Sequence, residues 1–252
     1  MTEYRVRING IETEARYSDR AVEEIFLPLL RKLTEMQNRA GKRILVMLAA
    51  PPGAGKTTLL TLLEKLSREH GEIGRIQTIG MDGFHRPQDY LLSHEVTREG
   101  QRIPMVRIKG APVTFDLQGL TERVRRVAAG ENCPWPLYDR LLHNPVDNGL
   151  TVEEKIVILE GNYLLLEEEG WRDLSAFADF TISLRAPENL LRKRLIDRRI
   201  RTGVEKDAAV RFVDFSDMPN ARLCLEKTMP ARLMLELDEG EDWRVCTSCP
   251  GI

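Results

Sequence analysis

The sequence has few cysteines and almost no net charge, and both shortages exclude classes of protein. Its 252 residues include four cysteines, too few for a disulfide scaffold in a chain of this length. The formal net charge is -2, so bulk charge gives no argument for binding nucleic acid or an anionic membrane. We therefore expect a protein of the reducing cytoplasm that does not act on nucleic acid.

Long apolar runs are also missing. No run approaches the roughly 20 residues needed to span a bilayer. The first ten residues, MTEYRVRING, contain no apolar core of a signal peptide. The hydrophobic share is 42% and the charged share 30%, which is typical of a globular protein. The expectation is one large α/β domain, or two small ones, without a membrane role.

The first forty residues predict a small extension before the main domain. Two runs of alternating apolar residues flank Asn9 and Gly10, a pair that suits the tight turn of a β-hairpin. A helical stripe follows and ends at Gly41, with Pro28 inside it, so we expect the helix to kink or restart there. We assign residues 1–40 to this extension. Its hairpin could offer an edge for pairing, so both a monomer and a homodimer remain open.

The remaining residues, 41–252, alternate buried strands with helices. This order predicts an α/β fold with a doubly wound parallel sheet. Strands are expected at 43–49, 75–80, 155–161 and 179–184, with 232–237 as the candidate for the last one. Helices are expected at 57–70, 116–129 and 187–202.

The segment APPGAGKT, residues 50–57, matches the phosphate-binding pattern G-x-x-x-x-G-K-S/T except that Ala50 replaces the first glycine. Glycines allow the backbone N–H groups to turn toward an anion, and the following helix adds its positive end. Lys56 can reach the β- and γ-phosphates, and the Thr57 hydroxyl can ligate Mg²⁺. A strand before and a helix after disfavour a chance glycine-rich turn. The predicted ATP contacts in this loop are Pro52, Gly53, Ala54, Gly55, Lys56, Thr57 and Thr58.

Two acidic residues follow other predicted strands. Asp82 lies in IGMDGFHRP, where it is either a turn former or a carboxylate that takes a proton. Glu160 ends the buried strand of VILEG, where it either caps the strand or holds Mg²⁺. Ligands of open α/β sheets bind at the carboxyl ends of the strands, which favours the functional interpretation of both.

The guanine-reading motifs of GTPases, N-K-x-D and D-x-x-G, are not found. Instead, the P-loop is followed in order by MDGFH, KGAPVTFD, YDRLLHNP, ILEGNYLLL and an arginine-rich segment. Over residues 41–237 this order resembles the phosphoribulokinase/uridine kinase family. Within that family it is most similar to the pantothenate-kinase-like branch and to bacterial proteins described as nucleoside or fructose-transport kinases.

The resemblance implies the three-layer α/β fold of P-loop NTPases, with its parallel sheet, and it implies a function. Such kinases transfer the γ-phosphoryl group of ATP, with Mg²⁺, to a hydroxyl of a small metabolite. It implies that Asp82 is the catalytic base or orients the hydroxyl, beside Lys56, Glu160 and Arg198 as the other catalytic candidates. The acceptor stays open among nucleosides, sugars and pantothenate-like compounds. The alternative is an ATP-binding regulatory or assembly protein without a small-molecule acceptor.

On the acceptor side, several residues have two interpretations. Lys109 is either an anion or hydroxyl ligand or a solvated loop lysine, and Asp116 either caps the next helix or contacts substrate. The segment 136–145 resembles the hairpin or loop that covers the acceptor in the family. His85 and His143 could simply face solvent. The predicted substrate-binding residues are His85, Lys109, Tyr138, Arg140 and His143.

The predicted lid is the helical segment 186–203, in which Arg194, Arg198 and Arg201 form one stripe. This stripe either contacts the ATP phosphates and stabilises transition-state charge or is a solvated basic face. By resemblance alone, Asn220 is placed near the adenine.

The last cysteines, Cys246 and Cys249, form a C-T-S-C pair. A structural zinc site needs further ligands at a matching spacing, and none is present. We therefore expect an ordinary terminal segment here.

Overall fold

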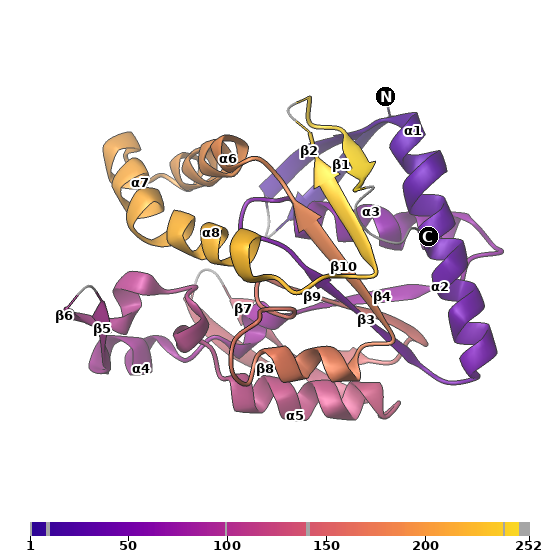
Figure 1. Ribbon diagram of the computed structural model, residues 1–252, viewed down its shortest axis with the longest axis horizontal. Helices are drawn as coiled ribbons and strands as arrows, with labels where there is room; N and C mark the ends of the chain where they lie inside the picture. Colours follow the sequence, from indigo (N-terminus) through magenta and orange to yellow (C-terminus); the bar gives the residue numbers. More distant parts are fainter. Residues whose placement is uncertain (1, 9–10, 99, 140–141, 239, 247–252) are drawn as a thin grey trace.

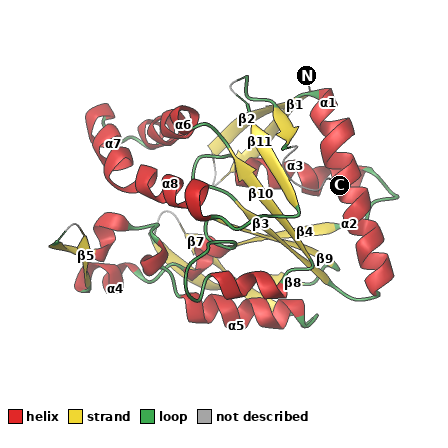
Figure 2. Cartoon of the chain, in the orientation of Figure 1, coloured by secondary structure: helices red, strands yellow, loops and turns green. Residues whose placement is uncertain are grey.

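The computed structural model describes residues 2–8, 11–98, 100–139, 142–238 and 240–246 (Figures 1 and 2). Its centre is a six-stranded sheet in the order β12–β11–β10–β3–β9–β4. Neighbouring strands are parallel except for β12, which is antiparallel to β11. The strands are β3 (Ile44–Ala49), β4 (Ile76–Gly80), β9 (Ile156–Gly161), β10 (Phe180–Arg185), β11 (Leu233–Leu237) and β12 (Trp243–Val245). The predicted doubly wound parallel sheet is confirmed.

The apolar runs of the sequence fill both faces of this sheet. Every residue of β3 is buried, and its side chains alternate between two apolar clusters. Val46 belongs to the cluster shared with α3 (Lys56–Glu69), whereas Met47 belongs to the one shared with α5 (Leu117–Ala128). The sheet is therefore the middle of three layers, and its strands need continuous apolar sequence.

The N-terminal extension has the predicted hairpin and helix. Strands β1 (Thr2–Ile8) and β2 (Ile11–Tyr17) pair antiparallel, while the predicted turn residues Asn9 and Gly10 lie outside the described residues. A short helix α1 (Asp19–Ala21) leads through a π-helical turn η1 (Val22–Phe26) into α2 (Leu27–Ala40). Pro28 lies in the first turn of α2, directly after this π-helical turn, so the helical run changes its winding just before the proline.

This extension packs on the sheet rather than standing apart. Leu30 and Leu33 of α2 are fully buried in the same apolar cluster as Val46 of β3. Gly41 ends α2 with a φ of 64°, a conformation that glycine adopts easily. The division into an extension and a kinase domain stays a prediction.

Several elements were not predicted. Strand β12 follows β11, so 232–237 is not the last strand; a three-residue strand carries too short a pattern to recognise. One hairpin, which pairs β5 (Glu95–Arg98) with β6 (Gln101–Pro104), was not predicted. Another pairs β7 (Cys133–Asp139) with β8 (Asn144–Val152) and includes the segment 136–145, for which the resemblance implied a hairpin or a loop. Helix α6 (Glu188–Arg201) is the helix expected at 187–202. The helices α4 (Gln88–Ser93), α7 (Lys206–Phe212) and α8 (Met218–Lys227) and the π-helical turn η6 (Val213–Asp217) were not predicted. The 3₁₀ helices are η2 (Met81–Phe84), η3 (Met105–Ile108), η4 (Pro112–Thr114) and η5 (Arg172–Phe177).

Two groups of elements lie beside the central sheet. Helices α6, α7 and α8 form one group, and α4 with β5 and β6 forms the other, below α7 and α8 in Figure 1. No helix within the described residues has the length and apolar character needed to cross a membrane.

Candidate active site

The phosphate-binding loop joins the end of β3 to α3. Gly53 and Gly55 have φ values of 84° and 92°, the left-handed region that glycine tolerates. Lys56 begins α3, and its Nζ donates to the carbonyl oxygens of Ala50 at 3.1 Å and Pro51 at 3.3 Å. The loop thus has the backbone conformation that an anion cradle requires, with its lysine folded over it.

The strongest contact of this lysine was not predicted. Lys56 Nζ donates to Asn162 Oδ1 at 2.7 Å, and Asn162 follows the end of β9 directly. The sequence could have indicated this contact, because Asn162 lies in the motif ILEGNYLLL, two residues after Glu160. Strand β9 pairs with β3, so a residue that follows β9 reaches the same edge of the sheet as Lys56.

Glu160 of β9 meets Thr57 of the first turn of α3. Thr57 Oγ1 donates to Glu160 Oε1 at 3.4 Å. Glu160 is the residue of β9 that pairs with Leu48 of β3 on one side and Gly80 of β4 on the other. Hydroxyl and carboxylate oxygens are the ligands that Mg²⁺ prefers, so these two residues fit that ion. Within the described part of the chain, no group of three or more His, Cys, Asp or Glu side chains is arranged to hold a metal.

Asp82 lies in η2, just beyond the end of β4. Its neighbour Gly83 is required by packing, because a Cβ atom there would collide with the carbonyl oxygen of Pro136 in β7. Trp135 of β7 also donates from Nε1 to the Gly80 carbonyl at 2.8 Å. Strand β7 therefore crosses the end of β4 and fixes the backbone that carries Asp82.

Three predicted acceptor-side residues pack together. The His85 ring stacks on Phe115 with centroids 4.0 Å apart, and Tyr138 meets His85 edge-on at 5.0 Å. Lys109 Nζ lies 5.1 Å from the centre of the Tyr138 ring. His143 is exposed, with a φ of 53°, and its carbonyl oxygen accepts from Lys109 Nζ at 2.9 Å. The predicted Arg140 lies outside the described residues.

Two other predicted residues have clear local surroundings. The Asp116 side chain accepts from the Gly119 N–H at 3.2 Å and so caps α5, which is the first of its two interpretations. Asn220 is buried, and its Nδ2 lies 3.6 Å from where a Cβ of Gly110 would stand, beside the acceptor-side loop. Its contact with adenine stays a prediction.

The predicted lid is α6, and its arginines have different partners. Arg194 Nη1 donates to the Gly53 carbonyl at 3.4 Å, while Nη2 pairs with Glu241 at 2.7 Å. Arg201 donates to the carbonyl of Asp197 in its own helix, and Arg198 is exposed. Arg194 is therefore a member of the stripe that contacts the phosphate-binding loop.

Helix α6 is fastened to η6 by two other arginines. Arg192 makes a bidentate pair with Asp214 at 2.7 and 2.9 Å. Arg199 pairs with Asp217 at 3.0 Å and stacks on Phe212 at 3.6 Å. These contacts were not predicted, because partners in a separate helix leave no periodic signal.

The cysteines form no zinc site within the described residues. Cys249 lies outside them, while the backbone N–H of Cys246 donates to Met234. Cys224 is buried behind the active site, where its Sγ donates to the Asn162 carbonyl at 3.3 Å. Burial raises the pKa of this thiol to about 12, against the opposing charge of Lys56.

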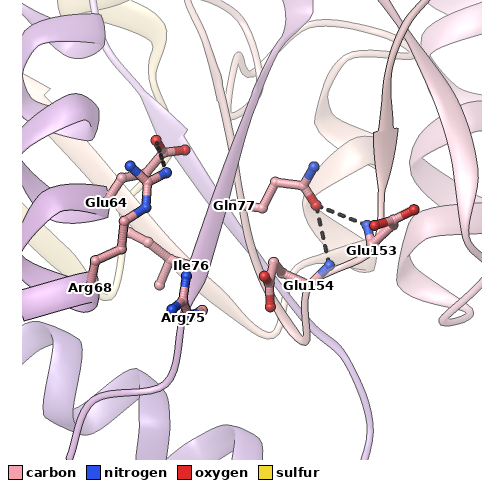
Figure 3. Close-up of a pocket in the computed structure, with 7 residues that line it drawn as sticks. All are labelled: Glu64, Arg68, Arg75, Ile76, Gln77, Glu153 and Glu154. Carbon is pink, nitrogen blue, oxygen red and sulfur yellow. Dashed lines mark hydrogen bonds and ion pairs between the residues drawn. The ribbon is translucent and has the colours of Figure 1, made fainter. Parts of the chain in front are cut away.

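A polar cavity of about 220 Å³ lies elsewhere, at the amino ends of β4 and β9 (Figure 3). Two of its polar side chains are engaged within the protein. Glu64 accepts from the backbone and hydroxyl of Thr78, and Gln77 Oε1 accepts from the N–H groups of Glu153 and Glu154. This cavity is separate from the rim that carries the P-loop, Glu160 and Asp82.

Comparison with known proteins agrees with this geometry. The model of the Phosphoribulokinase / Uridine kinase family matches residues 45–232. The uncharacterized protein YggC of Escherichia coli is 40% identical over 92% of this chain and 94% of its own. A Schizosaccharomyces pombe protein described as "Putative uridine kinase" is 31% identical over 82% of this chain and 90% of its own.

A solved structure is also similar. It is a protein of Silicibacter sp. TM1040 described as a "putative fructose transport system kinase". It has 32% sequence identity and a TM-score of 0.72, covering 82% of this chain and 98% of that one.

Proposed function

The chain belongs to the Phosphoribulokinase / Uridine kinase family of small-molecule kinases, and on this premise we propose that it transfers the γ-phosphoryl group of ATP to a hydroxyl of a small metabolite. One observation carries the proposal. The neighbouring strands β3, β9 and β4 lead at the same edge of the sheet to Lys56, Glu160 and Asp82. Phosphoryl transfer needs these three functions side by side: a phosphate cradle, a metal-holding oxygen and an acceptor-activating carboxylate.

On the nucleotide side, the loop N–H groups and the start of α3 bind the phosphates, and Lys56 neutralises charge on the transferred group. Asn162 holds the Lys56 ammonium in position at 2.7 Å. Thr57 and Glu160 would hold Mg²⁺, which when bound offsets the negative charge of the phosphates. Arg194, which touches the Gly53 carbonyl, adds positive charge above the same loop.

On the acceptor side, Asp82 orients the hydroxyl and receives its proton. The acceptor oxygen forms a bond to the γ-phosphorus while the bond from that phosphorus to the β–γ bridging oxygen breaks. ADP leaves with the electron pair of the broken bond. Nucleosides, sugars and pantothenate-like compounds all offer such a hydroxyl.

The proposal is tested by measuring ATP consumption with and without a panel of these compounds, and by detecting the phosphorylated product by mass spectrometry. Asp82→Asn should retain ATP binding and lower transfer by about 10²–10⁴-fold, the usual contribution of a general base. Lys56→Ala should sharply weaken nucleotide turnover. Lys65→Ala is its control, because Lys65 lies on the exposed side of the same helix. A protein that hydrolyses ATP only in response to another protein, with no phosphorylated compound, would be a regulator instead.

A further inference from the structure

Lys109 has an unusual set of neighbours for a lysine. Its Nζ donates to Gln88 Oε1 at 2.7 Å and to the His143 carbonyl at 2.9 Å, and it faces the ring of Tyr138. These partners come from three separate segments, namely α4, the turn between β7 and β8, and β7 itself. All three are neutral groups, and no ion pair of Lys109 exists within the described part of the chain.

This arrangement leaves the ammonium group without its full complement of partners. An ammonium carries three N–H donors, and only two are used by the described residues. Lys109 is half-buried, and burial lowers its pKa. Withdrawing a cation from water without a counter-ion costs free energy, which an anionic ligand would offset.

A chain of contacts links the Lys109 ammonium to Asp82. Tyr138 contacts Lys109 on one side and His85 on the other, and the backbone N–H of His85 donates to the carbonyl of Asp82. Phe115 is buried and stacks on His85, so it supports that ring from within the protein. A small compound lying along the partly exposed rings of Tyr138 and His85 would therefore have a carboxylate at one end and an ammonium at the other.

From this geometry we propose that the acceptor is a hydroxy compound bearing an anionic group, a carboxylate or a phosphate, and that Lys109 binds that group while Asp82 activates the hydroxyl. Gln88 and the His143 carbonyl act as positioning groups, because each accepts a hydrogen bond from the ammonium. The inference rests on the proposed kinase function and narrows its acceptor class: neutral nucleosides and unmodified sugars are disfavoured.

The test compares matched compounds that differ in one charged group. Suitable pairs are pantothenate with pantothenol, glycerate with glycerol, and ribulose 5-phosphate with ribulose. Binding is measured by thermal shift and calorimetry with Mg²⁺ and a non-hydrolysable ATP analogue present, so that the P-loop is occupied and cannot bind the anion itself. The anionic member of at least one pair should bind about tenfold to a hundredfold more tightly, as a charge-assisted hydrogen bond implies. The carboxylate and phosphate pairs distinguish the two sources of charge.

Lys109→Met keeps the apolar stem and should abolish that preference, whereas Lys155→Met, at an exposed site before β9, should leave it unchanged. The wild-type panel is informative even if Lys109→Met does not fold. A panel in which no anionic member binds better than its neutral partner overturns the inference. Phosphorylation of neutral compounds alone would leave the kinase function standing and reject the anion site. Anion binding that depends on Lys109, without any phosphoryl transfer, would keep the anion site and reject the kinase function.

Discussion

Lys56 of the phosphate-binding loop and Asn162 at the end of β9 are joined by a hydrogen bond of 2.7 Å. This bond connects residues 106 positions apart and holds the ammonium between the loop carbonyls and the next strand. It gives Asn162 a positioning role that depends on the neighbouring strands β3 and β9.

The first prediction concerns this bond. Asn162→Ala should lower the turnover number by about tenfold to a hundredfold, because a misplaced catalytic group loses much of its effect. The KM for ATP should change less, because the loop N–H groups still bind the phosphates. Steady-state kinetics separates the two effects. Asn38→Ala, on the exposed end of α2, is the matched control, and equal kinetics for both variants would remove Asn162 from the site.

Gly83 should be intolerant of any side chain. In Gly83→Ala, the new Cβ would meet the Pro136 carbonyl, so β7 or η2 must shift at a cost of about 1–3 kcal/mol. Thermal unfolding should show a lower midpoint, and activity should fall with the displacement of Asp82. Gly71→Ala has open space around the added carbon and serves as the control. An unchanged midpoint for the Gly83 variant would contradict the packing argument.

A third prediction concerns the contact that η6, between α7 and α8, makes with β5 and η3. Phe215 of η6 is flanked by the guanidinium groups of Arg98 at 4.5 Å and Arg107 at 5.0 Å. Phe215→Leu keeps an apolar side chain but removes both cation–π contacts, each worth about 0.5–1 kcal/mol at an exposed site. Trypsin should then cleave the hairpin β5–β6 several times faster. Leu92→Ala alters another exposed apolar residue, on α4, and should leave the cleavage rate unchanged.

Cys224 should be chemically inert in the folded protein. With a pKa raised to about 12, it holds only about 10⁻⁴ of its population as thiolate at pH 8, and the thiolate is the reactive form. Iodoacetamide should therefore label Cys224 only after unfolding in urea, as followed by mass spectrometry of the peptide. Equal labelling rates in the folded and unfolded chain would show that the thiol is accessible.

The sequence by itself determined the elements whose signal is local. The apolar runs of β3, β4, β9 and β10 and the period of α3 and α5 are set by neighbours a few residues apart, so both type and position were predictable. The same holds for the phosphate-binding loop, because Gly53 and Gly55 define its backbone within eight residues. Asp82 and Glu160 followed from the rule that ligands bind at the carboxyl ends of parallel strands.

Only the tertiary structure decided how these pieces meet. Glycine is needed at position 83 because β7 crosses the end of β4 and leaves no space for a side chain there. Lys109 gains its neutral partners from segments 21 and 34 residues away, and Asn162 reaches Lys56 over 106. Such contacts leave no periodic trace in one sequence, because pairing across long chain separations depends on the packing of the whole sheet rather than on local propensity.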